Sequence, residues 1–359
     1  MVVLLVPPSR RGVRLTRRST VLFTTVTAFP SVHTAVQEYV RGVSTPGDHA
    51  QSELSSSYEN AVFEQFFESL TEPRDRARLN SCRRQHASGW LLPKPFEDRI
   101  DDWFSPAEFC IAVRLRLGLP LTDVPNLCRM CWKCPVDVEG DHSLLCLSGG
   151  YRNTLHNSLR DMVFRYASMA NMSPKREEVC FPGRSMRADV YIPSTVKPSG
   201  ETIRPVCIDF AITHYATIKG LAASADDVAK NVNRYAESVK RTKYSAQAEA
   251  AGIDFAPAVC DTLGCFCYAG LDILRRIAMQ WGRRFDLQPG RSIPIFMQRI
   301  NSLIIRGVAG IALVNAVPDD DAIPSSRPVD LPLLQPPTLP EEDVAVHAIA
   351  EGWPLCTQR

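Results

Sequence analysis

The spacing of apolar residues predicts helices in the first third of the chain. Apolar side chains recur every three to four positions over residues 58–70, and a second helix is predicted over 74–87. Ser105-Pro106-Ala107-Glu108 has the residues of a helix start, with a serine N-cap, a proline in the first turn and a glutamate at the third helical position. This helix is expected to end at Gly118.

After a cysteine-rich stretch and one further helix, the spacing of apolar residues changes from every three to four positions to every second position. A helix is predicted over 154–170, and alternation of apolar and polar residues then predicts strands over 179–181, 187–192 and 206–213. The later elements are a long helix, a strand and two helices, predicted over 222–251, 253–259, 270–285 and 294–313. Because strands are followed by a long helix and a further strand, we expect an α/β core behind a helical segment.

These patterns divide the chain into five expected segments. The first is a poorly ordered basic arm, and the last is a Pro-rich, acidic tail that we expect to be disordered. A helical segment, a zinc module and the α/β domain lie between them. In chain order, the segments are the arm (1–55), the helical segment (56–125), the zinc module (126–150), the α/β domain (151–316) and the tail (317–359).

Composition narrows the class of protein. Apolar residues make up 45% and charged residues 22% of the chain, as in globular proteins. The net charge of +2 gives little electrostatic steering of nucleic acid toward the protein, which argues against a histone-like binder. Nucleic acid would have to be bound by local basic patches. Arginines of the N-terminal arm form a candidate patch for nucleic acid or nuclear import; solvated charge without a function is the alternative.

The 12 cysteines are expected to be reduced, with some of them bound to metal. The apolar start of the chain is short and is followed by Pro7 and Pro8, unlike a secretory signal. No window reaches the roughly 18 apolar residues of a membrane span. We therefore expect an intracellular, nuclear protein that makes no membrane contact.

The cysteine-rich stretch has the spacing of a zinc module. Cys131-x2-Cys134 places two thiolates on a tight turn, and His142 and Cys146 follow at short intervals. Thiolate and imidazole ligands suit a tetrahedral, structural zinc ion. We choose Cys131, Cys134, His142 and Cys146 as the ligands.

Two further residues are alternative zinc ligands. Cys128 makes a second, overlapping pair with Cys131, so one thiol of the three is spare, and Cys134 is preferred because it lies nearer to His142 along the chain. His156 begins an amphipathic helix, where a helix-cap or core histidine is the alternative. Ordinary reduced thiols remain the alternative for the whole cluster.

Two predicted strands each carry an aspartate. In 187–192, Asp189 is expected on the face opposite Ala188, Val190 and Ile192, and in 206–213 Asp209 opposes the apolar set. If the strands pair, the two carboxylates converge on one divalent cation. Mg²⁺ prefers carboxylate and phosphate oxygens, and it polarises a phosphate and helps to generate hydroxide. The alternative is that both aspartates cap strands or pair with arginines.

The order of these residues resembles a known family. Glu178, Asp189, Asp209 and a later lysine resemble the PD-(D/E)-x-K restriction-endonuclease-like fold. The wider arrangement, over about residues 104–264, looks like the C-terminal part of non-LTR retrotransposon proteins, whose restriction-like endonuclease nicks target DNA. The motifs that carry this resemblance are the CCHC module, Gly149-Gly150, Leu155-His156-Asn157, Arg187-Ala188-Asp189-Val190, Ile208-Asp209, Lys240-x2-Lys243-Tyr244 and Gly252-x2-Phe255-x-Pro257.

The sequence departs from that family at the lysine. Ala188 stands at the proline of the motif and Ala211 at its lysine, and no polymerase is present. On a straight helix with 100° per residue, Lys243 lies about 60° from Val228 in the expected buried stripe, and Lys240 lies about 120° away. Lys243 is therefore the first choice and Lys240 the second; solvated helix lysines are the alternative.

The resemblance implies a metal-dependent endonuclease. Asp189, Asp209, a lysine and Glu178, or its neighbour Glu177, would form the magnesium-dependent site, and zinc would be structural. The partners would be target DNA and, in addition, retrotransposon RNA or a separate reverse transcriptase. The alternatives are an inactive, transposon-derived zinc protein that binds nucleic acid, and a decayed reading frame without a function.

Overall fold

The computed structural model describes residues 50–92, 104–123, 125–180, 187–193, 195–196, 202–217, 225 and 229–316. Most of the predicted basic arm and the whole predicted acidic tail lie outside these residues. The chain divides into two units, and helix α3 (Ala50–Ser69) belongs to the first. The second unit, Glu72–Gly352, contains every element described below. The five segments drawn from the sequence stay a prediction.

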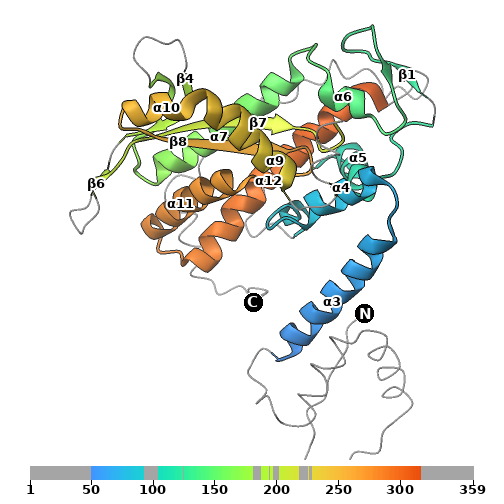
Figure 1. The fold of residues 1–359 in the computed structure, drawn as a ribbon, viewed down its shortest axis with the longest axis horizontal. Coiled ribbons are helices and arrows are strands. Elements are labelled where there is room, and N and C mark those ends of the chain that lie inside the picture. The colour runs from blue at the N-terminus through green and yellow to red at the C-terminus, as the bar shows by residue number, and fades with distance from the viewer. Residues whose placement is uncertain are drawn as a thin grey trace, which may run out of the picture. The chain divides into compact units, whose positions relative to one another are not determined.

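A four-stranded mixed sheet forms the centre of the second unit (Figure 1). Its order is β3-β4-β7-β8, with antiparallel pairing from β3 to β7 and parallel pairing between β7 and β8. Parallel strands need a crossover, and here it is a long helical segment. The bounds of the strands are Lys175–Val179, Arg187–Ile192, Val206–Thr213 and Asp254–Asp261. Two short pairs lie outside this sheet: β1 (Asn126–Leu127) with β2 (Pro135–Val136), and β5 (Thr195–Val196) with β6 (Thr202–Ile203).

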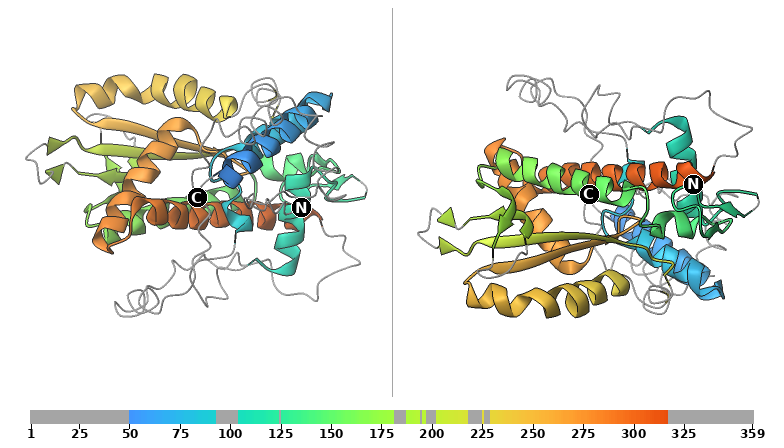
Figure 2. Two further views of the ribbon diagram at one scale, coloured as in Figure 1. Left: turned by 90° about the horizontal axis from the view of Figure 1, so that it is seen from below. Right: turned by 90° about the horizontal axis from the view of Figure 1, so that it is seen from above.

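Helices cover both faces of the sheet (Figure 2). The crossover covers one face with α9, a π-helical segment η3 and α10, which span Lys230–Tyr235, Ala236–Arg241 and Thr242–Ala250. On the other face lie α7, α11 and α12, which span Tyr151–Met169, Tyr268–Arg284 and Pro289–Ala316. The architecture is therefore the expected mixed α/β class.

Four further helices are described in this unit, and all but α4 make extensive contacts with α12. They are α4, the short 3-10 helix η1, α5 and α6, with bounds Pro73–Arg83, Gly89–Leu91, Pro106–Leu117 and Asp141–Leu145. The predicted start and end of α5 are confirmed: Ser105 and Glu108 form a reciprocal capping box, and Gly118 adopts the left-handed conformation at its C-cap.

Alternation of side chains along β7 is confirmed. Ile208 and Phe210 belong to the large core cluster with α7, α11 and α12, whereas Cys207 packs in a smaller cluster with Ala248 of α10. The alternation predicted for β4 fails at one residue. Val190 and Ile192 lie in the large cluster, but Ala188 packs with Cys207 on the opposite face.

Strands β4 and β7 have the predicted bounds, but two other predictions are wrong. The first strand of the sheet is Lys175–Val179, not 179–181, because an edge strand with exposed side chains on both faces has no apolar alternation to detect. Helix α4 ends at Arg83, before the predicted end, and His86 beyond it has a left-handed φ of 71°.

Helix α12 also differs from expectation. By length and composition its 27-residue stretch Pro289–Asn315 is long and apolar enough to cross a membrane, which the sequence reading excluded. However, 83% of its most apolar window is buried inside the structure, as in the central helix of a packed core.

Gly264 offers a test of this core. Its φ is +82°, and a Cβ there would lie 2.1 Å from Nδ2 of the fully buried Asn301, which donates to the Gly264 carbonyl at 3.3 Å. We expect Gly264→Ala to lower the free energy of unfolding by roughly 1–3 kcal/mol more than Gly252→Ala. The control has a similar φ of +67° but nothing within 4 Å of the new Cβ. Equal losses in urea denaturation would contradict the packing described.

Candidate metal centre and carboxylate site

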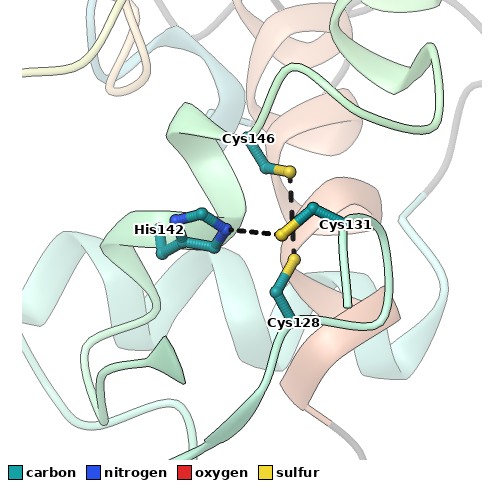
Figure 3. A group of neighbouring side chains, drawn as sticks. All are labelled: Cys128, Cys131, His142 and Cys146. Carbon is teal, nitrogen blue, oxygen red and sulfur yellow. Dashed lines mark hydrogen bonds between the residues drawn. The ribbon is translucent and has the colours of Figure 1, made fainter. Parts of the chain in front are cut away.

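Four side chains meet beside the β1–β2 hairpin (Figure 3). Cys128 follows β1, Cys131 lies in the turn, His142 lies on α6, and Cys146 caps that helix. Their ligand atoms all lie within 4.8 Å of one another, with 3.9 Å between Cys128 Sγ and Cys146 Sγ and 3.4 Å between Cys131 Sγ and His142 Nε2. Tetrahedral zinc with ordinary bond lengths separates its ligands by about 3.5–3.8 Å. The Cys3His cluster is thus geometrically compatible with zinc.

The backbone of the hairpin prepares the thiols for a metal. The Cys128 N–H donates to the Cys134 carbonyl at 2.9 Å, and the Trp132 N–H donates to the Cys128 carbonyl at 2.8 Å. Backbone N–H groups of Lys133 and Cys134 point at the Cys131 sulfur and lower its pKa to about 6. Burial instead raises the pKa of Cys128 to about 11. Metal binding would therefore release a proton from Cys128.

The cluster differs from the predicted ligand set in one member. Cys128 is buried and belongs to the cluster, whereas Cys134 is exposed and lies outside the four. Distance along the chain to His142 favours Cys134 over Cys128. That criterion does not separate the two, because Cys128 pairs with Cys134 across the hairpin and so lies at the same level on the opposite strand.

Asp189 lies where strands β4 and β7 separate. The hydrogen-bonded pairing of these strands ends at Val190–Ile208. The next N–H of β7 that faces β4 is that of Phe210, and it has no strand carbonyl of β4 opposite it. This N–H donates instead to Asp189 Oδ2 at 2.7 Å. The carboxylate thereby takes the place of a strand carbonyl at the position between Ala188 and Val190, which pack in different clusters.

His156 contacts this carboxylate and not the zinc cluster. Its Nε2 lies 3.1 Å from Asp189 Oδ2, and this hydrogen bond raises the pKa of His156. The alternative assignment of His156 as a zinc ligand is therefore wrong. The first turns of α7 carry the imidazole to the sheet, a contact that the sequence pattern of an amphipathic helix does not reveal.

Asp209 pairs with a lysine of the crossover helix. Lys240 Nζ lies 2.5 Å from Asp209 Oδ2, and the two side chains are only 17% and 14% exposed. Burial raises the pKa of Asp209, the Lys240 ammonium lowers it, and the Asp189 carboxylate raises it further. Each strand thus contributes one carboxylate to a shared electrostatic site, with His156 and Lys240 on either side.

The preference for Lys243 is wrong. Lys243 is exposed, with its Nζ over the Tyr244 ring at 4.8 Å, and Lys240 makes the contact with Asp209. The π-helical segment Ala236–Arg241 is the reason, because each of its residues turns through less than the 100° of an α-helix. The accumulated lag rotates Lys240 toward the sheet and Lys243 away from it.

Glu178 and Glu177 have other partners. Glu178 lies 3.2 Å from Lys175 on edge strand β3, and Glu177 lies 2.5 Å from Arg160 of α7. Within the described part of the chain, the groups that act most on Asp209 are Lys240, Asp189 and His156. The geometry gives Glu178 no place in the site beside Asp209.

A buried polar network joins the zinc module to the end of β7. His214 follows β7 and is 1% exposed; its Nδ1 lies 2.7 Å from Thr262 Oγ1 and its Nε2 3.0 Å from Asp141 Oδ1. Arg74 of α4 forms a two-pronged ion pair with Asp141, which directly precedes the ligand His142. Although burial opposes it, hydrogen bonds from Arg74 and His214 lower the pKa of Asp141 to about 2.

Arg152 of α7 makes a second link. Its guanidinium donates to the Leu145 carbonyl in α6 at 3.3 Å and to the Ile212 carbonyl in β7 at 3.1 Å. Sequence reasoning missed Arg74, Arg152 and His214. Their partners are remote along the chain, so no local spacing signals them.

Comparison of the chain with protein-family models, with curated proteins and with solved structures finds no match. The functional assignment therefore depends on the geometry of the two sites.

Replacing single cysteines distinguishes the two ligand sets. We expect Cys128→Ser to lose most of its bound zinc, because a ligand of the closed tetrahedron is removed. Cys134→Ser should keep one zinc per chain. The measurement is metal content by mass spectrometry after purification under reducing conditions. The opposite result, zinc kept by Cys128→Ser and lost by Cys134→Ser, would restore the ligand set predicted from the sequence.

Proposed function

We propose that this protein is a retrotransposon-derived, magnesium-dependent endonuclease that nicks DNA by phosphodiester hydrolysis. The observation that carries the proposal is the ion pair of Lys240 with Asp209 on β7, together with the carboxylate of Asp189 on the adjacent strand β4, which acts electrostatically on Asp209. The order of the parts, an acidic residue on each of two adjacent strands and a lysine on the next helix, is that of the restriction-like endonuclease resemblance. A zinc-compatible cluster precedes these parts in the same order.

The residues fit a hard divalent cation. Asp189 Oδ2 is engaged by the Phe210 N–H and by His156, and among the described residues Oδ1 has no hydrogen-bond partner. Asp209 contributes a second carboxylate from the neighbouring strand. Mg²⁺ held by these oxygens would polarise the scissile phosphate and lower the pKa of an attacking water.

The chain's own residues have distinct parts in this mechanism. His156 and the Phe210 N–H orient Asp189, because both donors hold the same oxygen. Lys240 brings a positive charge to within reach of the negative charge that develops on the phosphate. Lys240 thereby supplies, from a helix, the charge that is missing at Ala211 of β7.

The zinc module is suited to position nucleic acid. Each of its three cysteine ligands is adjacent in the chain to an exposed, large apolar residue: Leu127 is 49%, Trp132 68% and Leu147 83% exposed. Trp132 also has a left-handed φ of 53°, a strained conformation that the hairpin imposes. Exposed aromatic rings stack on bases, and Lys133 beside the tryptophan is exposed for a phosphate.

The links through His214 and Arg152 hold this module at the end of β7, so DNA bound to the module would lie near the end of the strand that carries Asp209. Retrotransposon RNA or a separate reverse transcriptase as partner, and a nuclear location, are further proposals supported by the family resemblance.

A nicking assay on supercoiled DNA with Mg²⁺ tests the proposal. We expect Asp189→Ala, Asp209→Ala and Lys240→Met to lose activity by on the order of 10²-fold or more. Lys243→Met and Glu178→Gln should retain it, since these side chains lie outside the site. Equal cutting by wild type and Asp209→Ala would exclude this site. No cutting by wild type, with DNA still bound in a salt-sensitive manner, would favour the inactive nucleic-acid-binding alternative.

Trp132→Ala tests the role of the zinc module. Loss of one stacking contact should weaken DNA binding by about 1–3 kcal/mol, measured by fluorescence anisotropy. Zinc content should not change, because the tryptophan is not a ligand. Tyr268→Ala is the matched control, since Tyr268 is a similarly exposed aromatic residue (64%) outside the module. Equal DNA affinity of the two variants and wild type would remove the tryptophan from the interface.

A further inference from the structure

The Lys240–Asp209 ion pair has a consequence for cation binding. The ammonium lies 2.5 Å from Asp209 Oδ2, within a site where both side chains are more than four-fifths buried. A divalent cation bound to the same carboxylate would sit about 2.1 Å from an oxygen. Two positive charges so close together repel strongly where water is excluded. Lys240 and a catalytic cation therefore compete for Asp209.

Nucleic acid provides the means to relieve this competition. A backbone phosphate offers the ammonium a second acceptor, and the flexible stem of lysine allows the charged group to move without its helix. Lys240 lies in the π-helical segment Ala236–Arg241, whose buried Ala236 anchors the backbone on the sheet. Movement of the ammonium from Asp209 to a phosphate would then need a change in the lysine side chain alone.

We propose that Lys240 couples DNA binding to cation loading, so that the acidic pair binds its cation weakly until a backbone phosphate draws the lysine away from Asp209. This inference rests on the proposed nuclease function. It adds that the site is latent in the DNA-free protein, with Lys240 occupying the position of the cation.

Thermodynamic linkage makes the coupling reciprocal. If DNA strengthens cation binding by a given factor, the cation must strengthen DNA binding by the same factor. Coupling between ligands of one protein is commonly 5–150-fold, and we expect about tenfold here. Removal of the ammonium should abolish the competition and, with it, most of the coupling.

Binding of Mn²⁺ to the zinc-loaded, full-length protein measures this directly. Electron paramagnetic resonance gives the Kd of Mn²⁺ with and without a short phosphorothioate duplex, which resists hydrolysis. In wild type, the duplex should lower the Kd about tenfold. In Lys240→Met, the Kd without DNA should already be about tenfold lower than in wild type, and the duplex should change it less than about twofold. Lys243→Met, one helical turn away, should behave as wild type.

Three other results are informative. If Lys240→Met binds Mn²⁺ no more tightly than wild type, or keeps the full coupling, the proposal is wrong. If Asp209→Asn binds Mn²⁺ as wild type does, the cation is elsewhere and the proposed nuclease site itself fails. If Lys240→Met does not fold, Lys240→Gln replaces it, because glutamine also removes the charge but keeps a polar side chain. The reciprocal measurement is the affinity of the protein for DNA with and without Mn²⁺.

Discussion

The separation of β4 from β7 at Asp189 is the constraint on which the acidic site depends. A buried backbone N–H needs an acceptor, and once the ladder ends at Val190–Ile208 the N–H of Phe210 finds it in a side chain. The requirement to satisfy one peptide group thus fixes a carboxylate in a buried place. It also fixes which oxygen is engaged, because His156 holds the same Oδ2. The chemistry proposed for Asp189 follows from a break in the sheet.

Directional polar contacts also join the two sites. A hairpin as short as β1–β2 cannot bury enough surface to be stable alone, so its position must come from metal and from neighbours. Asn315 at the end of α12 accepts from the Arg129 N–H at 2.7 Å, and Asp141 is held by Arg74 and His214. These polar contacts are directional. The zinc module is therefore docked on the sheet in a fixed orientation, which an apolar contact surface would not guarantee.

The sequence predicts those features that depend on local spacing. The bounds of β4 and β7, the capping box of α5, and three members of the Cys3His cluster follow from periodicity or from short motifs. The errors share a cause. Cys128, His156 and Lys240 take their places through long-range folding: a helix that folds back over a hairpin, a helix that crosses a sheet, and a helix that is not regular. Edge strand β3 was missed because exposure on both faces removes the alternation.

The π-helical segment explains how one crossover helix meets two demands. Measured from buried Val232 on a regular helix at 100° per residue, Lys243 lies about 20° and Lys240 about 80° from the sheet-facing stripe. If the six residues of η3 turn through roughly 80° each, Lys240 comes to about 20° and Lys243 to about 100°. The same lag aligns Ala236, which packs with Val259, and Ala248, which packs with Phe255; on a regular helix they would lie about 120° apart. Both halves of the helix can therefore pack on the sheet only with the π-helical segment between them. The same segment places Lys240 beside Asp209. In the proposed nuclease site, the position of the lysine is therefore fixed by the packing of the core.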